Sequence, residues 1–397
     1  MARILMILDH SFPPDLRVEN EIETLVAAGF EVCLLAIGPD ERSETESFGG
    51  ARIIRDRISA AQRNRMRGLA GTLPILERYI VRRMVSIFAE WPFQAVHAHD
   101  LYLVGGALKG GRELGVKVVA DLHENWVAAL KHYAWSNRMP AKLFINLKRW
   151  DRLETEWLSG VDGVIVVIEE MAERLSAKGI GKQNMIVLPN TIHRTRFDAY
   201  GIDPHLAGSI KSDLTILYTG GMDKHRGIEE AIRAMPTVLE SVPDARLVLV
   251  GDGAVRGELE RLSRGLRLQH TVQFTGWQPQ DKIPSYIAGA NIGLIPHLKT
   301  EHTDHTIPHK LFHYMHLGLP VVASNCRPLE RIVTGTDAGL IYTSGDAEEL
   351  ALTVLTLAEN PELAAQKGEN GRLGVAAQYN WESTSSGLKD FYRKLFA

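Results

Sequence analysis

The sequence predicts two α/β domains, each built on a doubly wound parallel β-sheet. Short apolar runs alternate with stretches of helical periodicity from one end of the 397 residues to the other. The strand candidates are apolar on both faces, which is typical of strands that helices cover on two sides. A polar, irregular stretch at residues 190–213 separates two series of such elements. We therefore expect one domain at residues 1–195, a second at 196–379 and a last helix at 380–397.

The first series begins with a buried strand. The opening residues MARILMILDH are apolar over too short a stretch for a signal peptide or a membrane span, and Pro13 and Pro14 soon follow. The expected strands are Arg3–Leu8, Glu31–Ile37, Ala95–Ala98, Val116–Asp121, Gly163–Ile168 and Met185–Leu188. The expected helices are Val18–Ala28, Ile75–Glu90, Leu101–Leu114, Ala141–Leu158 and Glu170–Lys178.

The second series repeats the pattern. Its expected strands are Thr215–Tyr218, Arg246–Val250, Thr271–Phe274, Ile292–Ile295 and Val321–Ser324, again separated by helices. In open parallel sheets, ligands bind at the carboxyl ends of the strands. The loops that follow these strands are therefore where site residues are expected.

Composition narrows the functional class. A net charge of −3, from 45 basic and 48 acidic residues, gives no overall field that would attract nucleic acid. The two cysteines, Cys33 and Cys326, are far apart and lack the spacing of a metal site. This usage fits a reducing compartment, so we expect a cytoplasmic protein.

Two segments of the second half are suited to binding phosphate. In TIPHKLFHYMHLGLPVVAS (306–324), Thr306 before Pro308 predicts the start of a helix, and Lys310 adds a charge in its first turn. A helix N-terminus offers free amide donors and about half a positive charge, which suits a diphosphate. The alternative is an ordinary amphipathic helix with a surface lysine.

The second phosphate candidate is the loop GGMDKHRG at 220–227. Its glycines, Gly220 and Gly221, let backbone amides approach a ligand closely, and Arg226 offers two parallel donors to phosphate. A glycine pair is more often only a tight turn. We predict that Arg226 and Lys310 converge into one cationic cradle for pyrophosphate.

Titratable residues follow two strands of the first half. His97, His99 and Asp100 come at the end of one strand, and Asp121, His123 and Glu124 at the end of the next. Active groups collect at such strand ends in this architecture. The alternative for His123 is a histidine that forms a structural hydrogen bond between domains.

Several motifs together resemble glycosyltransferase family 4, whose members have the two-domain GT-B fold. The segment 306–324 is similar to the family signature P-x-K-x-x-E-Y-M-x-x-G-x-P-V-V. Further segments match in the family's order: VDGVIVVIEEMAERL (161–175), VLPNTIHRTRF (187–197), YTGGMDKHRGIEEAI (218–232), LVLVGDGAVRGELE (247–260) and VQFTGWQPQDKIPSYIAGANIGLIP (272–296). The resemblance covers nearly the whole chain.

The resemblance implies a hexosyl-type glycosyltransferase that acts in polysaccharide biosynthesis. It implies a nucleotide-diphosphate sugar bound by the second domain, a saccharide or lipid-linked saccharide acceptor bound by the first, and a last helix that packs back on the first domain. It also implies retention of anomeric configuration, with no protein nucleophile, no metal and no other cofactor. The candidate donor-binding residues are Gly220, Gly221, Lys224, Arg226, Trp277, His305, Thr306, Lys310 and His313. Trp277 is a candidate because it follows a strand, and the alternative is a tryptophan of the core. The resemblance implies that His123 faces the transferred sugar, and Asp100 and Glu124 at the same strand ends are further catalytic candidates. Asp15 and Arg17, in the loop after the first strand, are candidates for contact with the acceptor.

Four positions depart from the family pattern. Gly221 and Arg226 stand where the family usually has arginine and lysine, and Lys224 is the expected substitute for the missing arginine. His305 and His313 stand where the family often has two acidic residues. Neutral imidazole accepts one hydrogen bond, so His313 can keep part of the acid's role toward ribose. The departures leave two alternatives open: a catalytically silent module that binds a nucleotide sugar or glycan, and a nucleotide-sugar epimerase of the same fold.

Two further patterns of the sequence bear on metal binding and on membrane association. His309, His313 and His316 share one helix face, but no cysteine or carboxylate pair joins them, so we predict no metal site. Residues 52–83 are rich in arginine, interleaved with apolar residues. Such a stretch either rests on an anionic membrane surface, which would make the protein peripheral on the inner face, or is a solvated basic loop and helix.

Overall fold

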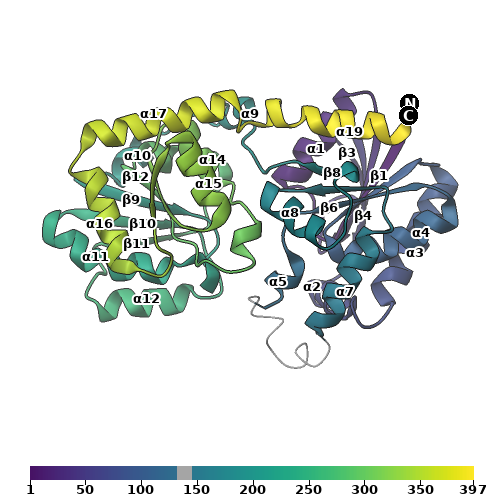
Figure 1. Ribbon diagram of the computed structural model, residues 1–397, viewed down its shortest axis with the longest axis horizontal. Coiled ribbons are helices and arrows are strands. Elements are labelled where there is room, and N and C mark those ends of the chain that lie inside the picture. The colour runs from purple at the N-terminus through teal and green to yellow at the C-terminus, as the bar shows by residue number, and fades with distance from the viewer. Residues whose placement is uncertain (132–144) are drawn as a thin grey trace. The chain divides into compact units, whose positions relative to one another are not determined.

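The computed structural model describes residues 1–131 and 145–397, which form two compact units (Figure 1). The first unit contains residues 1–189 and 385–397, and the second contains residues 190–384. The predicted boundary at 195 lies a few residues beyond the observed one. The predicted last helix at 380–397 is divided into α18 (Trp381–Thr384), in the second unit, and α19 (Ser386–Phe396), in the first.

The first unit is built on an eight-stranded sheet in the order β3-β4-β2-β1-β5-β6-β7-β8. All neighbouring strands are parallel except β3 and β4, which are antiparallel at one edge. The strands are β1 (Arg3–Leu8), β2 (Glu31–Gly38), β3 (Thr45–Phe48), β4 (Ala51–Arg57), β5 (Ala95–His99), β6 (Lys117–Leu122), β7 (Gly163–Val166) and β8 (Met185–Val187). Successive strands are added toward one edge from β1 to β4 and toward the other edge from β5 to β8, so the strand order reverses between β1 and β5. Such a switch point is where sheets of this kind bind ligands.

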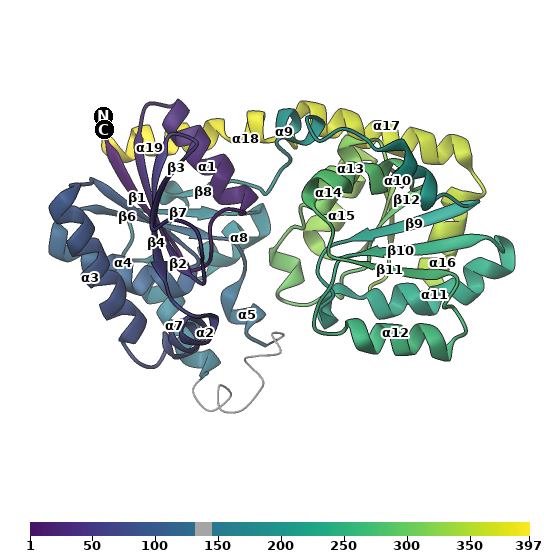
Figure 2. The same cartoon turned by 180° about the vertical axis from the view of Figure 1, so that it is seen from behind.

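Helices cover both faces of this sheet. Helices α1 and α19 pack against each other, whereas α3 and α4 pack together beside β5 and β6 (Figure 1, Figure 2). The helices are α1 (Leu16–Ala27), α2 (Ala60–Leu69), α3 (Ile75–Glu90), α4 (Leu101–Leu114), α5 (Trp126–Ala129), α7 (Leu147–Leu158), α8 (Glu169–Ala177) and α19. The helix predicted at Ala141–Leu158 corresponds to α7, and residues 141–144 of that prediction lie outside the described residues.

The structure corrects the interpretation of residues 52–83 as one basic loop and helix. Residues 52–57 belong to β4, where the side chain of Arg55 is buried and its guanidinium donates to the Phe12 carbonyl at 3.1 Å from Nε. Four arginines of this stretch form ion pairs: Arg52 with Glu90, Arg55 with Glu46, Arg67 with Asp9 and Arg83 with Asp56. Since these charges are compensated, the free basic surface is smaller than the sequence suggested.

The second unit is built on a six-stranded parallel sheet in the order β11-β10-β9-β12-β13-β14. The strands are β9 (Leu214–Thr219), β10 (Ala245–Val250), β11 (Val272–Gly276), β12 (Ile292–Ile295), β13 (Val321–Ser324) and β14 (Gly339–Tyr342). β14 was not predicted. The order reverses between β9 and β12, so this pair marks the switch point of the second sheet.

Helices cover both faces of the second sheet too, with α11 packed against α16 and α14 packed against α17 (Figure 1). They are α9 (Arg194–Asp198), α10 (Pro204–Ser209), α11 (Ile228–Ser241), α12 (Arg256–Gly265), α13 (Ile283–Ala288), α14 (Lys310–His316), α15 (Arg327–Thr336), α16 (Ala347–Ala358), α17 (Pro361–Ala377) and α18. Of the described residues, no helix is both long and apolar enough to cross a lipid bilayer.

Candidate active site

The loops that follow β9 and β12 meet at the switch point of the second sheet. The first loop contains residues 220–227 and a 3₁₀ turn, η2 (Lys224–Arg226). The backbone N–H of Leu298 in the second loop donates to the carbonyl of His225 at 2.9 Å. Gly227 has φ of 64°, and a Cβ there would lie 1.7 Å from the Pro296 carbonyl oxygen. Only glycine at position 227 lets the two main chains come this close. The two loops therefore contact each other through their backbones.

A side-chain contact completes the junction. The Arg226 guanidinium donates from Nη1 to Nε2 of His297 at 3.2 Å. Burial lowers the pKa of His297 well below its usual range, and the charges of Arg226 and Lys310 lower it further. His297 is therefore neutral and orients Arg226 without cancelling its charge. The His297 carbonyl is itself fixed by the Ser324 hydroxyl, 2.6 Å away.

Lys310 is the second cation of this site. Its residue is only 7% exposed, and its Nζ lies 3.4 Å from the ring centroid of Tyr218. A Cβ on Gly220 would lie 3.1 Å from this Nζ, so the glycine leaves room for the amine. Within residues 1–131 and 145–397, Nζ has no hydrogen-bond partner. Burial lowers the pKa of Lys310 well below its usual range, and the charge of Arg226 adds to the effect. The structure thus brings Arg226 and Lys310 together, as the sequence predicted.

The helix predicted to start at Thr306 starts later. α14 begins at Lys310, and Thr306 is extended with φ of −149°. A residue that precedes proline is disfavoured in the α conformation, so Ile307 before Pro308 delays the helix. Lys310 is consequently the first residue of α14 rather than a residue inside its first turn.

The two histidines that depart from the family pattern have local partners. His305 Nδ1 lies 2.6 Å from the carbonyl oxygen of Glu301. The His313 ring stacks on Phe197, with centroids 4.6 Å apart and planes 21° apart. Burial, with the neighbouring His309, lowers the pKa of His313 to about 3. His313 is therefore a neutral ring, as expected, but no contact of the structure tests its predicted bond to ribose.

Of the remaining predicted donor residues, Gly221 and Lys224 lie in the loop after β9, whereas Trp277 follows the edge strand β11. The Gly221 carbonyl accepts from the Tyr218 hydroxyl at 2.6 Å. Lys224 is exposed, and Trp277 follows β11 with 68% of its surface exposed. Their roles in binding a donor stay predictions.

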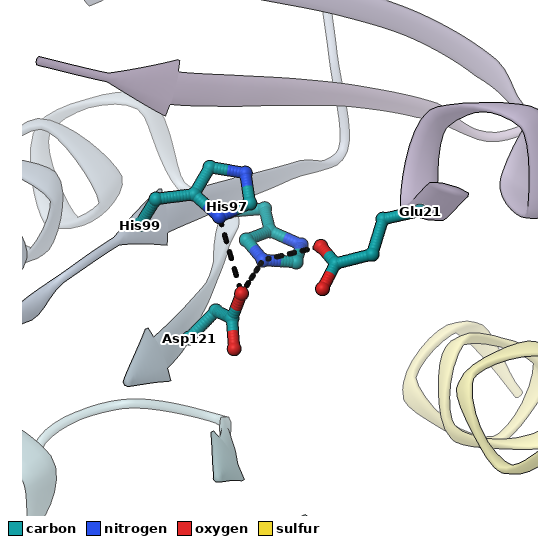
Figure 3. Close-up of side chains that lie close together, drawn as sticks. All are labelled: Glu21, His97, His99 and Asp121. Atoms are coloured by element: carbon teal, nitrogen blue, oxygen red, sulfur yellow. Dashed lines mark hydrogen bonds and ion pairs between the residues drawn. The ribbon is translucent and has the colours of Figure 1, made fainter. Parts of the chain in front are cut away.

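The first unit carries a separate cluster at the carboxyl ends of β5 and β6. Glu21 of α1, His97 and His99 of β5 and Asp121 of β6 point toward one another (Figure 3), and each is fully buried. Their ligand-type atoms all lie within 4.8 Å of one another. Glu21 was not predicted from the sequence, although its position four residues after Arg17 on a helix gives a signal for such a contact.

Asp121 is the centre of this cluster. Its two carboxylate oxygens accept from Arg17, at 2.6 Å from Nη2 and 2.9 Å from Nε. Arg17 Nε also lies 3.0 Å from Glu21. The Arg17 guanidinium thus lies between the two carboxyl groups. Arg17 is only 4% exposed, so the structure places it in the core of the unit and not at an acceptor surface.

The two carboxyl groups differ in protonation. Despite the cost of burial, Arg17 and the neighbouring histidines hold the pKa of Asp121 well below its usual range. Burial, together with the charge of Asp121, raises the pKa of Glu21 well above its usual range. Asp121 is therefore ionised and Glu21 is protonated at neutral pH.

His123 lies at the edge of the cluster. Its Nε2 is 2.9 Å from Asp121 Oδ2, and 19% of its side chain is exposed. Burial disfavours its charged form, but the carboxylates of Asp100 and Asp121 outweigh this and raise the pKa of His123 to about 10. His123 is thus an imidazolium at neutral pH.

The other predicted residues of this unit have structural contacts. Asp100 has φ of 74° and accepts from the Tyr102 hydroxyl at 3.1 Å. Asp15 caps α1 by accepting from Val18 N–H at 3.1 Å, and it pairs with His10 at 3.0 Å. Glu124 is half-buried next to His123.

Family comparison decides the class of the protein. The chain matches the family described as "Glycosyl transferase 4-like domain" over residues 15–191 and the one described as "Glycosyl transferases group 1" over residues 207–374. The chain is a family 4-like glycosyltransferase. It is 22% identical to the glycogen synthase of Mycobacterium tuberculosis over 305 residues, which is 76% of this chain and 69% of that protein.

Solved structures show the fold of this glycosyltransferase. The sucrose-phosphate synthase of Thermosynechococcus elongatus superimposes with a TM-score of 0.80 at 21% identity, covering 100% of this chain and 99% of that one. HepE of Anabaena in complex with UDP-glucose superimposes with a TM-score of 0.73 at 14% identity, covering 98% and 99%. The predicted GT-B fold is confirmed.

Proposed function

We propose that this glycosyltransferase moves a glycosyl group from a nucleoside-diphosphate sugar to a hydroxyl of a saccharide or lipid-linked saccharide. The observation that carries the proposal is the buried Lys310 amine, which lies beside Arg226 at the switch point of the sheet and has no hydrogen-bond partner among the described residues. Uncompensated buried cations are costly unless an anion joins them. HepE binds UDP-glucose, which supports a donor of the same class here.

The chemistry proposed for this site is departure of a diphosphate. The bond between the anomeric carbon and the phosphate oxygen breaks, and a bond to the acceptor oxygen forms on the same face of the sugar. The acceptor proton passes to the leaving phosphate. Negative charge grows on the diphosphate, so preorganised cations at Lys310 and Arg226 lower the barrier. These two charges do what a divalent metal would do, and we propose that activity survives chelation by EDTA.

His123 is the proposed catalytic residue of the first unit. It carries a positive charge at neutral pH because Asp100 and Asp121 raise its pKa. An imidazolium donates from both ring nitrogens. We propose that it donates to a hydroxyl of the transferred sugar, with Asp100 and Glu124 nearby.

A panel of UDP, GDP and ADP, free and as sugars, tests the proposal. A ligand at 100 times its dissociation constant adds about 2.7 kcal/mol of stability. Turnover that releases nucleoside diphosphate only with an acceptor, and gives a product of unchanged anomeric configuration by NMR, is the expected result. K310Q should abolish turnover, whereas K211Q, an exposed lysine before β9, should not.

Other outcomes of this panel contradict the proposal in distinct ways. An altered sugar still attached to its nucleotide indicates an epimerase. Tight binding without turnover indicates a silent module, which His305 and His313 at the acidic positions would then explain. A melting temperature that no nucleotide or nucleotide sugar changes contradicts the proposed donor site.

We further propose that the first unit rests on an anionic membrane surface around the α2–α3 connection. Leu73 and Ile75 are 43% and 46% exposed there. Arg65 and Arg78, which flank them, are also exposed. Exposed apolar residues with exposed arginines on both sides in the sequence suit an anionic lipid interface. Co-sedimentation with phosphatidylglycerol vesicles should exceed that with phosphatidylcholine, and L73S/I75S should reduce it; equal binding to both lipids contradicts the proposal.

A further inference from the structure

The buried cluster next to His123 extends to the last helix of the chain. Tyr392 of α19 is fully buried, and its hydroxyl lies 2.7 Å from Nδ1 of His97. The two rings are stacked, with centroids 6.1 Å apart and planes 21° apart. Although α19 follows the second unit in the sequence, it completes the polar core of the first.

The direction of this hydrogen bond follows from the protonation of its partners. Burial raises the pKa of Tyr392 well above its usual range, and Glu21 and Asp121 raise it further, so the phenol keeps its proton. Burial lowers the pKa of His97, so its ring is neutral. The hydroxyl therefore donates to Nδ1, and the imidazole proton of His97 is on Nε2.

In this tautomer the Nε2 proton of His97 faces the two carboxyl groups through electrostatic contacts, and Nε2 forms no hydrogen bond within the described residues. His97 Nε2 lies 3.5 Å from Glu21 Oε2 and 3.6 Å from Asp121 Oδ2 (Figure 3). Asp121 Oδ2 also lies 3.1 Å from His99 Nδ1 and 2.9 Å from His123 Nε2. A path of polar contacts thus runs from α19 to the partly exposed His123.

We propose that Tyr392 and Asp121 are positioning residues for His123. Tyr392 orients the His97 ring beside Asp121, and the Asp121 carboxylate holds Nε2 of His123 and leaves its Nδ1 to meet the sugar. The inference rests on the proposed function for the identity of the ligand at Nδ1. The orientation and charge of the His123 ring do not depend on the proposed function, since both can be measured in the ligand-free protein.

The charge of His123 depends on groups from several elements. Those that act on it are Asp121 of β6, His99 of β5, Asp100 after β5, Arg17 of α1 and Asp15 before α1. Asp100 and Asp121 raise its pKa, whereas burial and Arg17 lower it. Removing the Asp121 charge should lower the pKa of His123 by one to three units, as for other charges in direct contact.

The experiment is ¹⁵N-histidine NMR of the full ligand-free chain, titrated with pH. In D121N the pKa of His123 should fall by more than one unit. Y392F removes a hydroxyl and leaves every charge in place. In this variant the ¹⁵N shifts of His97 should change from those of a pure Nε2–H form to those of a mixture of tautomers. The pKa of His123 should fall by less than in D121N. Matched controls are D162N, just before β7, whose carboxylate accepts from Val118 N–H near the start of β6, and Y342F, whose buried hydroxyl has no hydrogen-bond partner in the described part of the chain.

An unchanged pKa of His123 in folded D121N overturns the inference. Where D121N does not fold, Y392F decides: ¹⁵N shifts of His97 equal to those of the wild type and of Y342F overturn it. Turnover distinguishes the inference from the proposed function. A positioning role predicts a lower kcat with an unchanged KM for the donor in Y392F. A wild-type chain that turns over no sugar contradicts the proposed function and leaves the titration of His123 to decide the inference.

Discussion

At the scale of single residues, Lys310 should make donor binding depend on protons. Burial and Arg226 lower its pKa in the free protein, so its charged form is disfavoured there. A diphosphate beside Nζ favours the charged form, and binding should therefore take up protons. Calorimetry of the best-binding nucleoside diphosphate in two buffers of different ionisation enthalpy measures this uptake.

The K310Q variant is the control for that measurement. A hydrogen bond to a charged group contributes about 1.5–3 kcal/mol, so K310Q should bind about tenfold to 150-fold more weakly. Its binding should also lose the proton uptake, whereas K211Q should keep both affinity and uptake. Equal uptake by K310Q and wild type would show that another group titrates.

His123 should make the stability of the first unit fall at alkaline pH. Its folded pKa is about 10, whereas an unfolded chain has about 6.5. The folded form keeps a proton that the unfolded chain releases. Its stabilisation is thus complete below pH of about 6.5 and is lost as the pH rises toward about 10. Within that window the loss is about 1.4 kcal/mol per pH unit. Urea unfolding should show this slope in the wild type and not in H123Q; parallel pH profiles would contradict the assignment.

At the scale of elements, the loop after β12 should orient the cation on the loop after β9. His297 accepts from Arg226 at 3.2 Å and adds no opposing charge. A neutral hydrogen bond contributes about 0.5–1.5 kcal/mol, so H297A should weaken diphosphate binding about twofold to tenfold. H297Q retains an acceptor oxygen and should lose less. H270A, at an exposed position, is the control, and wild-type affinity in H297A would exclude the role.

The same junction predicts a stability difference between two glycines. Gly227 and Gly179 both have positive φ, 64° and 90°. A Cβ on Gly227 would collide with the Pro296 carbonyl, whereas a Cβ on Gly179 meets nothing within 4 Å. G179A should cost only the left-handed strain of about 1–2 kcal/mol. G227A should cost more and also weaken diphosphate binding. Urea unfolding and calorimetry compare the two, and equal destabilisation would contradict the tight approach.

The predictability of these elements depended on where their apolar residues lie. Strands such as β1 and β9 are buried along almost their whole length and mostly apolar because helices cover both faces, so the sequence predicts them. β4 was missed because Arg55 interrupts its pattern, and the burial of that arginine depends on Glu46 of the neighbouring strand. The start of α14 lies later than the capping pattern at Thr306 predicts, because Pro308 disfavours the helical conformation at Ile307.

The candidate site followed the same logic. Arg226 and Lys310 could be predicted because each lies in a short motif after a strand. Glu21 and Tyr392 could not, since they reach the cluster through α1 and α19, and 295 positions separate Tyr392 from His97. Buried polar partners of this kind are set by tertiary packing and leave little local pattern.

At the scale of the whole molecule, the chain enters the second unit after Pro189 and returns to the first at Ser385. The first unit is therefore complete only once the last thirteen residues are present. Its core includes Leu388 and Tyr392 of α19, both fully buried, and the Phe391 ring lies against Gly163 of β7. Stability of the first unit should consequently depend on the far end of the chain.

Leu388 tests this dependence. Leucine-to-alanine changes in a core cost about 2–5 kcal/mol, a large part of the about 5–15 kcal/mol that stabilises a domain. L388A should therefore increase amide exchange in β1 and β5, the two central strands of the first sheet, and leave exchange in β9 and β10 unchanged. K394A, an exposed position of the same helix, is the control. Hydrogen exchange with mass spectrometry separates the two sheets by peptide. Equal acceleration in both sheets would mean that the units unfold together, and no change in β1 would mean that α19 adds nothing to the first unit.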